Sequence, residues 1–347
     1  MSKKIVIIAL ALVVIMGLFI YKPGLRFWSQ SGQVPKLKVV GVVYIRQHID
    51  AYNGFKDGMK KIGYEVNKNV AYDEVLAVTG PKLYDDLAAG IRKLIKDKVD
   101  IIFVTYELTA QAALEVSKEM KSDIPIVYMT RFHDPISYGI ANSFKSSGNN
   151  STGVATNLIE SIQKNLLFIK EINPQAKKVA VFSDGFMIPG GSDQILSELK
   201  KQAPKLGLRI VEYKTANAPD PTPNTWKGVA DKIKSGDIDA VYHLPVHFYD
   251  WQETDETTLA KRLHIPHAVP SEDMVTGGTF AFADDFHASA EQAATMVKKI
   301  LNGAKSSDIP IEFGTKSILI LNLKRQIEAG FKFPDSMLSI AEVKITQ

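Results

Sequence analysis

Two histidine pairs are the groupings in this sequence that most suggest metal chemistry. His243 and His247 are four residues apart, and His264 and His267 are three apart, spacings that would align two ring nitrogens on one helix. Both pairs, however, lie at the ends of strand-like runs, where such spacing brings no two side chains together. No His-Glu-x-x-His motif and no frame of paired carboxylates accompanies them. We therefore predict no metal site.

A glycine-rich segment, Gly185–Ser192, has the length of a phosphate-binding P-loop and follows a strand-like run. Gly191 takes the place of the lysine that reaches the phosphates, so the segment lacks the charge that nucleotide binding requires. The chain has no Gly-x-Ser-x-Gly nucleophile motif, and no Gly-x-Gly-x-x-Gly follows its first strand. We predict no catalytic residue and no cofactor. An enzyme built on the same fold stays a third alternative.

The composition excludes further classes of protein. The 347 residues exceed the roughly 250–300 that one hydrophobic core serves, so we expect two cores. The chain has 42 Lys and Arg residues against 38 Asp and Glu. Four of the basic residues precede residue 36, and the rest of the chain is neutral overall. Nucleic acid needs a concentrated basic surface, so we predict no nucleic-acid partner. The absence of cysteine excludes disulfides and thiolate chemistry.

The N-terminus has the layout of an export signal. Two lysines precede Ile5–Tyr21, a run without charge that would span about 25 Å as a helix. The run ends in bulky residues instead of the small ones that cleavage requires. We therefore predict an uncleaved membrane anchor, with a cleaved signal as the alternative, and a tether over residues 22–36. The lysines favour a cytoplasmic N-terminus and export of the remainder.

From residue 37 onward, short apolar runs alternate with longer amphipathic stretches. The runs are rich in Val and Ile and largely continuous, which is typical of strands buried on both faces of a parallel sheet. The strand-like runs are Leu37–Ile45, Ile101–Tyr106, Ile124–Thr130, Lys178–Ser183, Leu208–Tyr213, Ala240–Leu244, Ile265–Val269 and Thr279–Ala283. Helix-like segments include Tyr52–Ile62, Pro81–Lys96, Ala110–Met120, Gln194–Leu206 and Ala290–Leu301. This alternation predicts an α/β fold with parallel sheets.

A series of short segments follows one another in the order found in a known family. The segments are Leu37–Tyr44, Gly54–Tyr64, Asn67–Tyr72, Asp123–Tyr128, His133–Pro135, Gly148–Val154, Ile172–Val181, Ile300–Lys305 and Asp308–Pro310. Together they resemble the TrpX-like substrate-binding proteins of ABC transporters over roughly residues 37–340. The resemblance implies a type I periplasmic binding protein fold, with two doubly wound lobes joined by three crossings and a small solute held between them. Lobe 1 would comprise residues 37–142 and 275–312, and lobe 2 residues 143–274 and 313–340.

Ligands of open α/β sheets bind beyond the carboxyl ends of the strands. This rule selects Arg46–His48, Thr105–Thr109, Thr130–Asp134, Ser183–Gly185, Pro245–Tyr249 and Ser271–Asp273. From these segments we predict that the ligand-binding residues are Thr105, Tyr106, Glu107, Thr109, Arg131, Phe132, His133, Asp134, Ser183, Asp184, His247, Phe248, Glu272 and Asp273.

The residue types indicate what these side chains would bind. Arg131 suits a carboxylate, and one or two of the acids would pair with a ligand amine, because a buried cation without a partner is costly. The alternatives are structural: Asp134 before Pro135 could make a turn, and the aromatic residues could pack in the core. Relative to the family, Tyr106 and Glu107 replace smaller residues, and His133 stands where threonine is common.

The resemblance implies an extracytoplasmic solute-binding protein that delivers its ligand to an ABC permease and its ATPase. We expect the ligand to be an amino acid or a related zwitterion, and the protein to be a monomer anchored by residues 5–21. The alternative is a membrane-anchored receptor of the same architecture that senses a ligand and signals through a partner protein.

Overall fold

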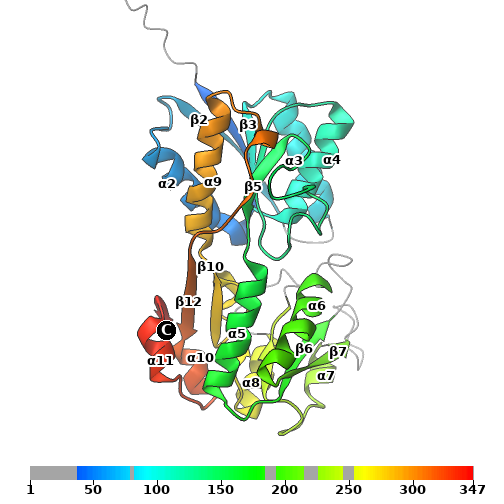
Figure 1. Cartoon of the computed structure of the whole chain (residues 1–347), viewed down its shortest axis with the longest axis vertical. Coiled ribbons are helices and arrows are strands. Elements are labelled where there is room, and N and C mark those ends of the chain that lie inside the picture. The colour runs from blue at the N-terminus through cyan, green and yellow to red at the C-terminus, as the bar shows by residue number, and fades with distance from the viewer. Residues whose placement is uncertain (1–36, 79–81, 184–192, 215–225, 245–253, 347) are drawn as a thin grey trace, which may run out of the picture. The chain divides into compact units, whose positions relative to one another are not determined.

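The continuous apolar runs form strands of two sheets (Figure 1). The computed structural model describes residues 37–78, 82–183, 193–214, 226–244 and 254–346, and Lys38–Gln347 form one unit. Among the described residues, no helix is long and apolar enough to cross a membrane. The predicted anchor and tether lie outside this part of the chain.

The first sheet is parallel throughout. Its strand order is β11-β5-β4-β3-β1-β2. The bounds are β1 Lys38–Ile45, β2 Val70–Ala77, β3 Ile101–Val104, β4 Ile126–Met129, β5 Ser151–Ala155 and β11 Glu312–Phe313. Every residue of β3, β4 and β5 is buried, which explains why β3 and β4 read as unbroken apolar runs.

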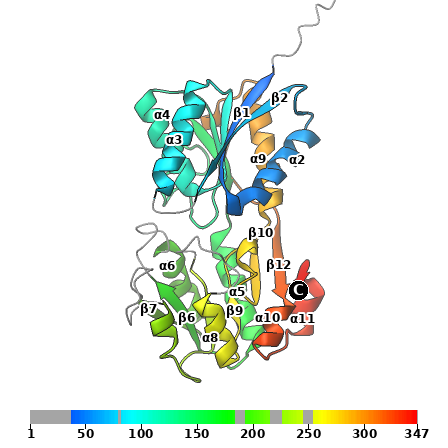
Figure 2. The same cartoon turned by 180° about the vertical axis from the view of Figure 1, so that it is seen from behind.

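Helices cover both faces of this sheet. They are α2 Ile49–Lys61, α3 Leu83–Lys96, α4 Glu107–Met120 and α9 Phe286–Leu301, and a short 3-10 turn, η1 Arg46–His48, follows β1. Figures 1 and 2 show α2 and α9 side by side on one face, and α3 and α4 together on the other. Phe55 of α2 stacks on Phe103 of β3 with ring centroids 3.9 Å apart, so α2 is held directly on the sheet.

The second sheet is mixed. Its strand order is β13-β12-β10-β9-β8-β6-β7, with β10 and β12 antiparallel. The bounds are β6 Lys178–Ser183, β7 Arg209–Lys214, β8 Ala240–Tyr242, β9 His267–Ala268, β10 Phe280–Asp284, β12 Ser317–Asn322 and β13 Val343–Ile345. The associated helices are α5 Leu158–Ile172, α6 Asp193–Gln202, α7 Trp226–Ala230, α8 Asp255–Leu263, α10 Leu323–Glu328 and α11 Asp335–Ile340. Three further 3-10 turns are η2 Ala203–Leu206, η3 Glu272–Met274 and η4 Ser306–Asp308.

The strand pairing differs from the expected lobe boundaries at two places. Residues 151–155 were assigned to lobe 2, but β5 pairs with β4 of the first sheet. Residues 280–284 were assigned to lobe 1, but β10 pairs with β9 and β12 of the second sheet. The chain therefore passes between the sheets at residues 155–158, 284–286 and 313–317. Residues 151–155 are polar, but their backbone pairs with β4 on one side and β11 on the other, and all five are buried, so they form an interior strand of the first sheet.

Candidate functional site

The strand order of the first sheet creates a natural binding position. In the order β2-β1-β3-β4-β5, the chain winds away in opposite directions from β1 and β3, and this leaves a crevice beyond their carboxyl ends. His48 follows β1 and Thr105 follows β3. Their side chains meet there, with His48 Nδ1 3.1 Å from Thr105 Oγ1. Two of the segments selected by the rule about strand ends therefore contact each other at the ends of β1 and β3.

A cavity of about 210 Å³ lies beside this junction. It is smaller than the roughly 300–1,000 Å³ that hold drug-sized ligands, so its size suits a small solute. The lining side chains come from the ends of β1 and β4, the first turns of α2 and α9, and η3: Gln47, His48, Asp50, Ala51, Arg131, Glu272, Asp273 and Phe286. The cavity thus combines residues that follow strands of both sheets.

Arg131 supplies the fixed positive charge of the cavity. Its side chain is only 4% exposed, and its Nη2 donates to Asp273 Oδ1 at 2.6 Å. The guanidinium lies 4.2 Å from the centre of the Phe286 ring, a favourable cation–π contact. Among the described residues, its Nε has no hydrogen-bond acceptor. Arg131 is therefore held on two sides, by the Asp273 carboxylate and by the Phe286 ring.

Carboxylates outnumber the arginine in this cavity. Burial raises the pKa of Glu272 to about 7; Arg131 opposes this rise, and the nearby Asp50, Asp273 and Asp285 add to it. Burial, and then the charge of Arg131, lower the pKa of His48 well below its usual range, so His48 is neutral near pH 7. The lining therefore presents one cation together with two or three acids, a pattern that complements a ligand bearing both an anionic and a cationic group.

Three of the predicted site residues line the cavity, namely Arg131, Glu272 and Asp273. Two more lie one contact away. Thr105 bonds to His48, and the ring of Tyr106 stands edge-on to His48 with centroids 5.4 Å apart. These two residues fix the position of a lining side chain from behind.

Glu107 does not line the cavity, and its carboxylate is hydrogen-bonded to other residues of the protein. Its fully buried carboxylate accepts hydrogen bonds from the backbone N–H of Arg131 at 2.8 Å and of Phe132 at 3.2 Å, and it contacts His133 Nδ1 at 2.6 Å. The loop that carries Arg131 is thereby tied to the first turn of α4. This geometry favours a positioning role for Glu107 and His133.

The other predicted residues do not line the cavity. Thr109 and Phe132 are buried. Asp134 Oδ1 accepts from the backbone N–H of Ile136 and Ser137, which is the turn given above as the structural alternative. The Ser183 hydroxyl donates to Glu212 Oε1 at 2.6 Å. Asp184, His247 and Phe248 lie outside the described residues.

Five lining residues were missed by the sequence reasoning: Gln47, His48, Asp50, Ala51 and Phe286. Gln47 and His48 belong to a strand-end segment that the rule had selected, so that signal was available. Asp50 and Ala51 follow directly, in the first turn of α2. Phe286 opens α9, far along the chain, and no local pattern distinguishes it from a core phenylalanine.

Comparison with known proteins identifies the family. Residues 36–345 match the family model described as ABC transporter substrate binding protein. A search of curated proteins returned no match.

Solved structures share the fold at low sequence identity. The ABC domain from Streptococcus pneumoniae in complex with L-Trp has 21% identity and a TM-score of 0.72, covering 89% of this chain and all of that chain. A substrate-binding protein with adhesive properties from Clostridium difficile has 22% identity and a TM-score of 0.70, covering 90% and 100%. An ABC transporter solute-binding protein from Agrobacterium vitis with bound allitol has 14% identity and a TM-score of 0.55, covering 82% and 95%.

The predicted fold class is confirmed: this is an α/β protein with the sheets of a type I periplasmic binding protein. Matching of nearly the whole chain also confirms the family that the sequence resembled. The chain belongs to the ABC transporter substrate-binding proteins, extracytoplasmic proteins that bind a small molecule and do not transform it.

Proposed function

We propose that this protein captures a small zwitterion, an amino acid or a close relative, for delivery to an ABC permease. The observation that carries the proposal is the charge pattern of the cavity, in which Arg131 stands against Asp50, Glu272 and Asp273. A bound carboxylate would accept a charge-assisted hydrogen bond from the Arg131 guanidinium. A bound ammonium would be compensated by the acids, which a buried cation requires.

The mechanism we propose is capture between two lobes, each built on one sheet and hinged at the three crossings. Arg131 follows β4 of the first sheet, and Asp273 belongs to η3, which follows β9 of the second. A zwitterion inserted between them would give each charged group a new partner, so no buried charge is left alone. Binding energy would then favour the closed arrangement of the lobes.

The charges also support an amino acid over a sugar. The structural neighbours include one complex with L-Trp and one with allitol. A neutral polyol offers hydroxyl groups but no charge to pair with Arg131 or with the acids Asp50, Glu272 and Asp273. An α-amino acid offers one group of each sign, matching the lining described above.

We further propose that the protein acts as a monomer and is held at the outer face of the cytoplasmic membrane by residues 5–21. The single uncharged run after two lysines supports the anchor. Anchoring would keep the receptor close to the permease that takes its ligand.

The test is a thermal-shift screen of the full-length chain in detergent against amino acids, small amines and neutral polyols. A ligand that binds only the folded state must raise the melting temperature. We expect a rise with at least one amino acid, and its loss in Arg131→Gln. The matched control is Arg92→Gln, because Arg92 is exposed and paired with Glu119 away from the cavity. A response to polyols alone, or an unchanged response in Arg131→Gln, would contradict the proposal.

A further inference from the structure

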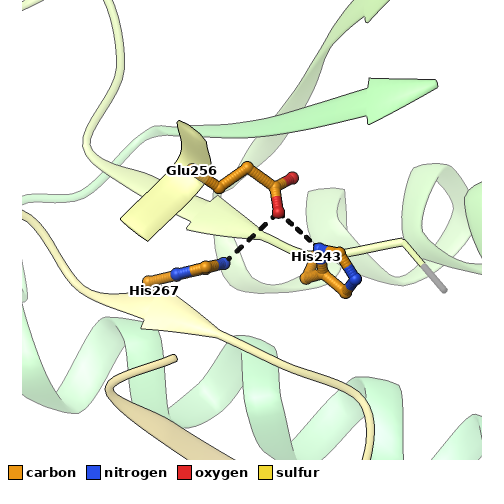
Figure 3. A group of neighbouring side chains, drawn as sticks. All are labelled: His243, Glu256 and His267. Atoms are coloured by element: carbon orange, nitrogen blue, oxygen red, sulfur yellow. Dashed lines mark hydrogen bonds and ion pairs between the residues drawn. The ribbon is translucent and has the colours of Figure 1, made fainter. Parts of the chain in front are cut away.

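A second cluster of polar side chains lies inside the second sheet, apart from the solute cavity. His243 directly follows β8, His267 begins β9, and Glu256 lies in the first turn of α8. Strands β8 and β9 pair in parallel, with Val241 opposite His267. Residues 241 and 243 lie on the same face of a strand, so both imidazoles lie on one face, where Glu256 meets them (Figure 3).

All three side chains are buried. Glu256 is 0% exposed, and both histidines are 2% exposed. His243 Nδ1 is hydrogen-bonded to Glu256 Oε2, and His267 Nε2 lies 3.6 Å from that same oxygen. One ligand atom of His243, one of Glu256 and one of His267 therefore all lie within 4.8 Å of one another.

The cluster has more polar atoms than the described residues satisfy. Both ring nitrogens of His267 and the Oε1 atom of Glu256 are buried without a hydrogen-bond partner in the part of the chain that the structure describes. Leaving a buried polar group unpaired is costly, more so for a charged one. A single proton shared between Glu256 and His243 would satisfy that pair and leave His267 unsatisfied. A cation at the centre of the three ligand atoms would give His267 a bond through one ring nitrogen and would balance the charge of the buried carboxylate.

We propose that His243, Glu256 and His267 bind a divalent transition-metal ion, for which zinc is the first candidate. Two imidazoles and a carboxylate are a ligand set that suits zinc. Copper(I) and iron–sulfur clusters prefer sulfur ligands, and this chain has no cysteine. Glu256 also lies at the N-terminal end of a nine-residue helix, where the helix dipole favours a negative ligand.

One of the three separations between ligand atoms already fits such an ion. Zinc binds nitrogen and carboxylate oxygen at about 2.0–2.2 Å in a tetrahedron, which sets neighbouring ligand atoms roughly 3.3–3.6 Å apart. The separation between His267 and Glu256 already has this value, and the bond between His243 and Glu256 would lengthen to it. A space of about 10 Å³ adjoins both histidines, on the order of one water molecule, which could supply a fourth ligand.

The ion would have a structural consequence for the neighbouring cavity. It would tie α8 to β8 and β9. Met274, which lines the small space, belongs to η3 together with Glu272 and Asp273. Metal binding would thus stiffen the turn that presents two acids of the solute cavity. This inference does not depend on the identity of the solute.

The test is metal binding by the full-length chain in detergent, stripped with a chelator and titrated with Zn²⁺ by calorimetry. We expect one zinc per chain after dialysis. X-ray absorption at the zinc edge should show two imidazole nitrogens at about 2.0–2.1 Å. The variants His267→Gln and Glu256→Gln each remove a ligand. They should weaken binding by more than the roughly 10–100-fold that loss of an outer-shell partner costs.

The control is His287→Gln, which removes the histidine of a partly exposed grouping with Asp57 and Glu291 and should leave affinity unchanged. The proposal is overturned if the folded chain retains no zinc, if His267→Gln binds as the wild type does, or if only His287→Gln loses the metal. Should a variant fail to fold, the absorption spectrum of the wild type decides, since a site without two imidazoles is not this one.

Discussion

At the scale of single residues, the position of Arg131 depends on a group that lies behind it. Glu107 accepts hydrogen bonds from the backbone of Arg131 and Phe132 and contacts His133, with no exposed surface. Truncating a buried charged partner typically costs roughly 3–5 kcal/mol. We expect Glu107→Ala to lose about that much free energy of unfolding in urea titrations. Glu107→Gln keeps one oxygen acceptor and should lose about 1–3 kcal/mol.

The control for this prediction is Glu119→Gln on the same helix, α4. Glu119 is exposed and pairs with Arg92, so its replacement should change stability by no more than about 0.5 kcal/mol. A Glu107→Ala protein within 1 kcal/mol of wild type would show that the loop carrying Arg131 needs no such support.

Glu272 gives a prediction about pH. Burial raises its pKa to about 7 from 4.5, so the folded state binds a proton more tightly than the unfolded state. The stability linked to this proton is complete below about pH 4.5 and is lost as the pH rises through 7. Relative to Glu272→Gln, wild type should therefore lose up to about 2–3 kcal/mol of unfolding free energy between pH 5 and pH 8.

Urea titrations at the two pH values measure this loss. Burial also raises the pKa of Asp284, to about 6, with the same sign. That contribution is common to both proteins and cancels in the comparison. Parallel pH profiles for wild type and Glu272→Gln would mean that Glu272 titrates as a solvated acid does.

Position at the end of a strand predicted part of the candidate site. Arg131, Glu272 and Asp273 were found because each follows a recognisable strand. The histidine cluster was missed because His243 and His267 are far apart in sequence and come together only through the pairing of β8 with β9. The histidines nearest to them in sequence are His247 and His264, so spacing along the chain gives no sign that His243 and His267 lie together.

At the scale of elements, the contact between α2 and α9 depends on two glycines. A methyl group on Gly54 would come within 2.3 Å of the His287 carbonyl oxygen, and one on Gly58 within 2.7 Å of the Glu291 Cα. Alanine gains about 1 kcal/mol of helix propensity over glycine, but here it would force the helices apart. We expect Gly54→Ala and Gly58→Ala each to destabilise the protein by at least about 1–3 kcal/mol in urea unfolding.

Lys60→Ala is the comparison for these variants, because Lys60 lies on the exposed side of α2. That protein should stay within about 0.5 kcal/mol of wild type. If Gly54→Ala were instead more stable than wild type, helix propensity and not close packing would govern this pair.

The pattern of the sequence predicted eight strands and missed β2, β5, β11, β12 and β13, of which β2, β11 and β13 lie at the edges of the sheets. All eight strand-like runs contain strands. Strand β5, with Ser151, Thr152 and Gly153, has no apolar signature. It is buried because Thr152 Oγ1 donates to the Ile309 carbonyl at 2.9 Å and because Gly153 lets Tyr128 approach. Such contacts exist only in the folded sheet, so the sequence placed the first crossing too early.

At the scale of the whole molecule, the anchor can be tested by the intact mass of the exported protein. The bulky residues that end Ile5–Tyr21 disfavour cleavage, so we expect the membrane fraction to contain the mass of all 347 residues. Phe19→Ala combined with Tyr21→Ala creates an Ala-x-Ala site and should release a shortened protein. Recovery of a shortened wild-type chain would replace the anchor with a cleaved signal.

The return of the chain to the first sheet has a consequence for how the protein is made. Lys61 on α2 pairs with Glu291 on α9 across 230 residues of sequence, and β12 and β13 complete the second sheet near the C-terminus. Contacts of such long range form slowly. A nascent chain that emerges N-terminus first therefore cannot finish either core until almost all of it has been synthesised. A fragment that stops before residue 286 lacks α9, β11, β12 and β13, so neither core is complete in it.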